Sequence, residues 1–347
     1  MFARKDKNIL GLDVGSRDVK AVELERTGGA YSITQVASRP LIGEDAKAQT
    51  LRQMMHEVNF KTNRVVTAVS GRSVIVRYIT MQLMNDSDLR TAIHYEADKY
   101  IPFGMDEVVI DCTRLPIEND AHTAPNEMKI LLVAVKRQVI EEHLAFLRDA
   151  DLQPMIIDVD SFALGNAFEI AGKFNPKVEE PAMVALVDIG ALKTNISIVK
   201  GSASYFTREV YLGGNNLTEA ISQRRGVDNY EAEALKIDPN TTWEEIGEEA
   251  HMALDDLGNE IQLSLDYFEN QFETEVSEVL LSGGTSMLPG LAEALGATFQ
   301  KPTRLWNPLA TVPVANPAIP PEYIQNVGPQ MAVALGLASR LRKEAKK

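Results

Sequence analysis

Two segments of this chain repeat one pattern, and the repeat limits what the chain can fold into. Residues 10–20 read LGLDVGSRDVK and residues 186–196 read LVDIGALKTNI, so Asp188 follows Asp13 by 188 − 13 = 175 positions. Each segment is an apolar run, an Asp-x-Gly turn and a second strand-like run, which predicts a β-hairpin. Glycine at such a turn leaves backbone N–H groups uncovered for a phosphate, and the aspartate is available to a metal ion. Two facing hairpins indicate a duplicated fold that binds a nucleotide between its halves.

The composition narrows the class of protein. The chain has 347 residues, enough for two domains that each bury a core. Its net charge of −14 argues against nucleic acid as a partner, because phosphate backbones repel an acidic surface. Cys112 is the only cysteine, and the five histidines show no metal-ligand spacing. This usage favours a reducing, cytoplasmic location over a disulfide-linked fold.

The hydropathy pattern does not predict an integral membrane protein. No apolar stretch approaches the roughly 20 residues needed to span a bilayer, and the basic residues 1–7 precede no apolar signal core. The basic C-terminal residues 340–347 carry almost no apolar face, so they do not predict an amphipathic anchor. We therefore expect membrane contact to be indirect, through a partner.

The order of apolar segments predicts two α/β halves with a small subdomain inserted in the first. Between 77 and 158 the chain reads as a β-α-β-β-α-β series, the split βαβ pattern. A loop at 175–181 is the expected boundary between the halves. In the second half we expect a long amphipathic helix at 243–272, a proline-rich surface connection at 302–321 and a final helix at 328–341.

Two shorter motifs follow the second hairpin. Residues 281–290, LSGGTSMLPG, predict a strand-to-helix turn with bare backbone, which can lie against a nucleobase or an α-phosphate. Residues 232–236, AEALK, place Glu233 and Lys236 on one face of a helix, a geometry able to grip two ribose hydroxyls.

In this order the motifs resemble the actin/hexokinase/heat-shock-70 ATPase superfamily over nearly the whole chain. The inserted split-βαβ subdomain resembles the FtsA branch of that superfamily. The segments AIHYEADKYIP at 92–102, GGNNLTEAI at 213–221 and LSLDYFE at 263–269 resemble the PilM family in particular, the actin-like cytoplasmic proteins of the type IV pilus inner-membrane assembly platform. The resemblance implies an α/β, actin-like ATPase fold: two duplicated ribonuclease-H-like halves with an inserted small split-βαβ subdomain like the 1C subdomain of FtsA.

The resemblance also implies a domain layout. The first half, 1A, is expected at 1–76 and the inserted subdomain, 1C, at 77–158. A connecting helix and loop at 159–180 lead to the second half, 2A and 2B, at 181–347, and a C-terminal helix near 328–341 completes 1A.

The same resemblance implies that the chain binds ATP with Mg²⁺. Asp13 and Asp188 would hold the ion through water, which suits a cation that dehydrates reluctantly. Lys20 would reach the phosphates, and Thr194 would lie near the γ-phosphate. The remaining expected contacts are backbone amides of Gly15, Ser16, Gly190 and Ala191 around the phosphates, Glu233 and Lys236 at the ribose, and Gly283, Gly284 and Thr285 along the adenosine.

Hydrolysis has a weaker basis in the sequence than binding. Phosphoryl transfer to water needs a group that orients the attacking water, and relatives place it on the helix that connects the halves. Asp160 is the catalytic candidate by location alone, and a helix cap is an equal interpretation of it. We expect weak hydrolysis or none.

The resemblance implies a scaffold rather than a metabolic enzyme. Its partner would be a PilN-like single-pass membrane protein, whose N-terminal cytoplasmic peptide would lie in a groove between the first half and the insertion, bordered by the helix at 87–100. This would place the chain in the cytoplasm, peripheral at the inner-membrane face. Other inner-membrane platform proteins and pilus motor ATPases are further expected partners. The alternatives are an FtsA-like membrane-tethered filament former and a metabolic kinase of the same fold.

Overall fold

The computed structural model describes residues 8–41, 47–115, 124, 126–173, 182–201, 203–238 and 240–340. The chain divides into two compact units, a larger one of residues 1–68 with 152–347 and a smaller one of residues 69–151. The predicted boundary loop at 175–181 and the basic ends at 1–7 and 341–347 lie outside the described residues.

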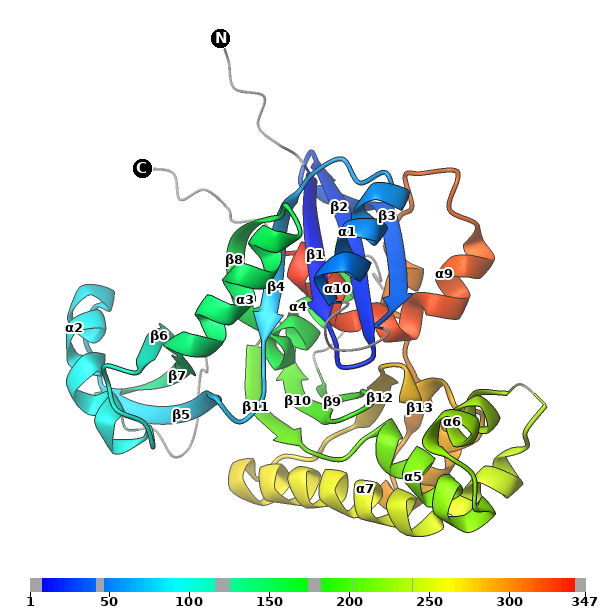
Figure 1. The fold of residues 1–347 in the computed structure, drawn as a ribbon. Helices are drawn as coiled ribbons and strands as arrows, with labels where there is room; N and C mark the ends of the chain where they lie inside the picture. The colour runs from blue at the N-terminus through cyan, green and yellow to red at the C-terminus, as the bar shows by residue number, and fades with distance from the viewer. Residues whose placement is uncertain are drawn as a thin grey trace. The chain divides into compact units, whose positions relative to one another are not determined.

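The larger unit contains a first sheet that begins with the predicted hairpin (Figure 1). Its strand order is β3-β2-β1-β4-β8, with β2 antiparallel to both neighbours and β4 parallel to β1. The strands are β1 (Asn8–Val14), β2 (Asp18–Thr27), β3 (Ala30–Pro40), β4 (Arg64–Val69) and β8 (Gln153–Val159).

A second sheet in this unit repeats the arrangement. Its order is β11-β10-β9-β12-β13, again with an antiparallel hairpin followed by a parallel strand. The strands are β9 (Met183–Ile189), β10 (Thr194–Lys200), β11 (Ala203–Val210), β12 (Glu278–Ser282) and β13 (Thr303–Leu305). The two sheets confirm the duplication that the repeated hairpins predict.

Two helices join these sheets into one core. Helix α4 (Asp160–Lys173) and helix α10 (Ala332–Ala338) pack against each other and share a buried cluster with Val22 of β2 and Leu186 of β9 (Figure 1). The approach is close: a Cβ at Gly336 of α10 would lie 1.8 Å from the Ala163 carbonyl oxygen of α4. Glycine is therefore required where the two helices meet.

A second core lies against the second sheet, where three helices contribute Leu217, Leu257 and Leu295. The long helix predicted at 243–272 has these bounds. The remaining helices of the larger unit are α1 (Lys47–Glu57), α5 (Gly214–Arg225), α6 (Asn229–Ile237), α7 (Trp243–Phe272), α8 (Leu291–Phe299) and α9 (Pro321–Val327).

The smaller unit is a three-stranded antiparallel sheet of order β5-β7-β6 with two helices. Its elements are β5 (Val74–Gln82), α2 (Asp86–Glu96), β6 (Val108–Arg114), β7 (Glu127–Lys136) and α3 (Arg137–Asp149). Strand β8, which we expected to close the β-α-β-β-α-β series of the insertion, joins the first sheet of the larger unit instead. Periodicity predicts that a strand exists but not which sheet it joins. Among the described residues, no helix is both long and apolar enough to cross a bilayer.

Candidate nucleotide site

The first hairpin places Lys20 directly opposite Asp13. The two residues are register partners across β1 and β2, and the Lys20 Nζ lies 3.2 Å from the Asp13 Oδ2. Burial opposes the charge on Lys20, but the carboxylates of Asp13 and Asp188 outweigh it and raise the pKa of the lysine. Lys20 and Asp188 interact electrostatically, so the two hairpins lie close to each other.

The second hairpin repeats this geometry with one change. Asp188 is the register partner of Asn195, seven positions later, as Lys20 is of Asp13. The Ser282 hydroxyl donates to the Asp188 Oδ1 at 2.9 Å. Burial raises the pKa of Asp188 to about 6, with Lys20 opposing the rise and Asp13 adding to it.

Both turns are closed by the same hydrogen bond. The Gly15 N–H donates to the Asp18 carbonyl at 3.0 Å, and the Gly190 N–H donates to the Lys193 carbonyl at 2.9 Å. These two amides, which we predicted at the phosphates, therefore serve the turns. In the described part of the chain the amides of Ser16 and Ala191 make no such bond, so they are the ones open to a ligand.

The glycine-rich turn at 281–290 packs against the turn of the second hairpin. The Thr285 hydroxyl donates to the Gly190 carbonyl at 2.9 Å. Gly283 has a φ of +90°, and a Cβ there would lie 2.4 Å from the Ile189 carbonyl oxygen, so only glycine fits. A Cβ at Gly284 would meet no atom within 4 Å. Of these two glycines, only Gly284 has open space beside it.

Thr194 is fully buried, and its hydroxyl donates to the Leu212 carbonyl at 2.8 Å. This bond accounts for the burial of the hydroxyl without a ligand. The predicted role of Thr194 near a γ-phosphate therefore has no support in its contacts.

Glu233 and Lys236 meet on helix α6, but the lysine is fully engaged. Its Nζ lies 2.6 Å from the Glu233 Oε2, 2.8 Å from the Thr218 hydroxyl and 3.0 Å from the Gly214 carbonyl oxygen. An ammonium has three hydrogens, so none is left over for a ribose. Burial lowers the pKa of Lys236, and Glu233 opposes that change. Lys236 thus supports Glu233 rather than facing a sugar.

Asp160, the catalytic candidate, begins α4 and accepts hydrogen bonds at both carboxylate oxygens. Its Oδ1 accepts the Ser161 N–H at 3.0 Å, and its Oδ2 lies 2.6 Å from the Lys193 Nζ and 3.2 Å from the Asn195 Nδ2. Lys193 also contacts Glu209. Burial raises the pKa of Asp160, and Lys193 opposes the rise.

Lys193 and Asn195 are the residues of this site that the sequence analysis missed. Asn195 is buried, and its Oδ1 has no hydrogen-bond partner in the described residues. The repeat predicts Asn195 as a site residue, because Asn195 follows Asp188 at the same spacing as Lys20 follows Asp13. Applying the 175-position offset to every residue of the first hairpin would have found it.

The donor set of the facing hairpins suits hydrated Mg²⁺. Mg²⁺ in proteins keeps several waters and uses one or two carboxylates together with phosphate oxygens. Asp13 and Asp188 supply two carboxylates, and Lys20 supplies a cation beside them.

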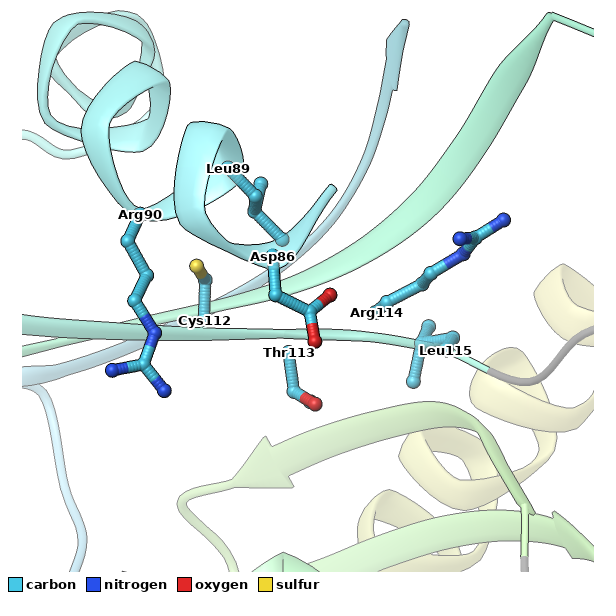
Figure 2. A pocket seen from close by; sticks show the side chains of 7 residues that line it. All are labelled: Asp86, Leu89, Arg90, Cys112, Thr113, Arg114 and Leu115. Atoms are coloured by element: carbon cyan, nitrogen blue, oxygen red, sulfur yellow. The ribbon is translucent and has the colours of Figure 1, made fainter. Parts of the chain in front are cut away.

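The smaller unit has a cavity of its own, about 430 Å³, between α2 and β6. Figure 2 shows Asp86, Leu89 and Arg90 of α2 above Cys112 and Thr113 of β6. None of the residues predicted to bind nucleotide lines it. It is the concave surface beside the helix that we expected to border a peptide groove.

Two similar sheets whose hairpins face each other define a protein of the actin-like fold class. The ethanolamine utilization protein EutJ from Carboxydothermus hydrogenoformans matches with a TM-score of 0.56 and 14% identity, over 96% of this chain and 89% of that one. MreB 5 of Spiroplasma citri bound to AMPPNP matches with a TM-score of 0.52 and 12% identity, over 96% and 95%. At these identities the likeness shows the fold, and it confirms the predicted fold class.

The family follows from two closer matches. Residues 11–342 match the family described as type IV pilus assembly protein PilM. A solved structure, the PilM-PilN type IV pilus biogenesis complex, matches with a TM-score of 0.83 and 30% identity, over 96% of this chain and 98% of that one. This chain belongs to the PilM family of actin-like type IV pilus assembly proteins, as its motifs predict.

Proposed function

We propose that this chain is an ATP-binding scaffold of type IV pilus assembly, recruited to the inner-membrane face by the N-terminal cytoplasmic peptide of a PilN-like partner. The observation that carries the proposal is the 30% identity, over nearly the whole chain, to the solved structure of a PilM-PilN complex. Contacts with other platform proteins and with pilus motor ATPases belong to the same proposal, as does a cytoplasmic, peripheral location.

The nucleotide part of the proposal rests on the facing hairpins. Asp13 and Asp188 would hold Mg²⁺ through water, Lys20 would contact the phosphates, and the amides of Ser16 and Ala191 would donate to them. Bound Mg²⁺ would neutralise phosphate charge. Glu233 would accept from the ribose, and Gly284 would lie along the adenosine.

We propose that hydrolysis is weak or absent. A carboxylate that orients an attacking water must offer an oxygen to it. Both oxygens of Asp160 already accept hydrogen bonds from the protein, Oδ1 from a backbone N–H and Oδ2 from Lys193 and Asn195, so at most one acceptor position of Oδ1 is left for a water. The ligand would then act by biasing the two halves toward a closed state.

The test measures two bindings in the same protein. A labelled peptide from the N-terminus of the cognate PilN-like protein should bind in a fluorescence anisotropy titration, and Mg·ATP should bind by calorimetry. Asp13→Ala and Asp188→Ala proteins should fold and lose Mg·ATP affinity. Unchanged nucleotide binding in both variants would overturn the site, and absent peptide binding with ATP still bound would overturn the partner.

A further inference from the structure

Three side chains converge on one oxygen of Glu233: Thr218 by a hydrogen bond, and Lys236 and Arg17 by ion pairs. The Oε2 lies 2.6 Å from the Lys236 Nζ, 2.5 Å from the Thr218 hydroxyl and 3.0 Å from an Nη1 of Arg17. Within the described residues the Oε1 makes no hydrogen bond. One oxygen is therefore fixed by the protein, and the other is left to accept from a ligand.

The three side chains come from both halves of the fold. Thr218 and Lys236 belong to α5 and α6 of the second half. Arg17 belongs to the turn of the first hairpin, between β1 and β2. The Arg17–Glu233 ion pair is therefore a direct connection between the turn that would bind phosphate and the helix that would bind ribose.

Arg17 differs from Lys236 and Thr218 in its surroundings. The Lys236 side chain is 5% exposed, whereas the Arg17 side chain is 45% exposed and lines a cavity of about 610 Å³ together with Leu192 of the second hairpin turn. Lys236 and Thr218 hold Glu233 within the second half. Arg17 completes the set only when the first hairpin lies against α6.

We infer that Arg17 is a positioning residue for sugar recognition: it fixes Glu233 so that the free Oε1 accepts the 2′- and 3′-hydroxyls of a bound ribonucleotide. The inference rests on the proposed nucleotide site and deepens it. Ribose recognition then depends on both halves, since the acceptor belongs to one half and its third support to the other.

The charges agree with this role. Burial disfavours a charged Glu233, but the hydrogen bonds from Lys236 and Thr218 and the positive charges of Lys236 and Arg17 outweigh it and lower the pKa of the carboxyl. Glu233 thus stays ionised at neutral pH. An ionised carboxylate accepts hydrogen bonds and cannot donate them, which matches hydroxyl donors on a sugar.

The test compares affinities for ATP and for 2′,3′-dideoxy-ATP, both with Mg²⁺, by calorimetry on the full chain. The wild-type protein should prefer ATP by about tenfold or more, as expected for hydrogen bonds to a charged acceptor. Arg17→Ala should lose most of that preference, and Arg17→Lys should keep most of it. Because Arg17 belongs to the turn that would bind the phosphates, its loss can weaken both ligands, but the ratio of the two affinities cancels that effect.

A second comparison separates Arg17 from other causes. Glu233→Gln should lose the preference, and Arg17→Ala combined with Glu233→Gln should lose no more than Glu233→Gln alone, because the two residues act as one unit. A ratio unchanged in Arg17→Ala would overturn the inference. A ratio that rises in Arg17→Ala would overturn it too, since Arg17 would then compete with the sugar. A wild-type protein that binds ATP without preference would also refute it, whereas no ATP binding at all would refute the proposed function.

Discussion

Asp188 is a buried carboxyl group of the candidate site whose ionisation costs the folded protein free energy. Burial raises its pKa to about 6 from the ordinary value of 3.8, so the folded state holds this proton more tightly than the unfolded state does. The stability that comes from the bound proton is complete below pH 4 and is lost as the pH rises through 6. An ionised Asp188 therefore destabilises the nucleotide-free protein at neutral pH.

Asp188→Asn should remove this destabilisation. We compare the unfolding free energies of the two proteins without Mg²⁺ or nucleotide. The difference, variant minus wild type, should increase by at most about 3 kcal/mol between pH 4 and pH 7. This limit follows from a shift of roughly two pKa units. Urea unfolding at several pH values measures it. A difference between the two proteins that does not change with pH would contradict the assignment. The same variant should bind Mg·ATP less well, so the site trades stability for binding.

Residue types and spacing allowed part of the candidate site to be predicted. Asp13 and Lys20 lie together because a seven-residue spacing across a short hairpin turn makes strand partners of its ends. Asp188 interacts with both, as expected if the repeated hairpin faces the first. Lys236 was expected at the ribose because helical spacing places it beside Glu233, but spacing carries no information on the Gly214 carbonyl that takes its third hydrogen. A residue distant in sequence can form a hydrogen bond with a side chain that helical spacing alone would leave available to a ligand.

At the scale of elements, the contact of α10 with its neighbours is the most sensitive part of the fold. A Cβ at Gly336 would lie 1.8 Å from the Ala163 carbonyl oxygen of α4, and one at Gly11 of β1 would lie 2.0 Å from the Ala334 carbonyl oxygen of α10. Backbone atoms on both sides cannot give way as a flexible side chain can. These two glycines set how closely α10 approaches both elements.

Gly336→Ala should therefore destabilise the chain by about 3 kcal/mol or more, the upper range for overpacking a core. The matched control is Gly172→Ala, also in a helix, where a Cβ would meet no atom within 4 Å. It should be neutral or raise stability by up to about 1 kcal/mol, because alanine favours helix over glycine. Thermal unfolding of both variants tests the pair, and equal effects would show that α4 and α10 do not meet at Gly336.

Elements were easier to predict than their surroundings. The apolar face of α7 predicts the bounds of the helix, because apolar spacing at 3.6 residues per turn is a local property of the sequence.

The prediction for the connection at 302–321 was wrong. It was expected on the surface, yet Trp306, Leu309 and Val312 are buried in the core that α4 and α10 share. The final helix begins at 332 rather than 328, since Gly328 and Pro329 form a 3₁₀ turn first. Proline frequency indicates irregular backbone but says nothing about burial.

At the scale of the whole molecule, the duplication was the most predictable feature and the asymmetry within it the least. The two halves share strand order, hairpin register and the hydrogen bond that closes each turn. They differ where Lys20 of one half corresponds to Asn195 of the other, and where only the first half receives an inserted unit. At these matched positions one half supplies a cation, and the other supplies an amide whose oxygen has no hydrogen-bond partner among the described residues.

This division has a consequence for a scaffold that binds both a nucleotide and a peptide. The candidate nucleotide site needs both halves, because Lys20 and Asp188 belong to different hairpins. A peptide that binds the closed arrangement better should therefore bind more tightly when Mg·ATP holds the hairpins together. We expect Mg·ATP to raise peptide affinity by about fivefold or more, the lower range of typical coupling between sites.

Thermodynamic linkage makes this prediction testable from two directions. Saturating peptide must raise ATP affinity by the same factor as saturating Mg·ATP raises peptide affinity. Anisotropy measures one factor and calorimetry the other. Asp188→Ala is the control: its peptide affinity should equal that of the nucleotide-free wild type and should not respond to ATP. Equal peptide affinities with and without Mg·ATP in the wild type would show that the nucleotide stabilises the fold without switching its partner, since a ligand shifts an equilibrium only by its difference in affinity for the two states.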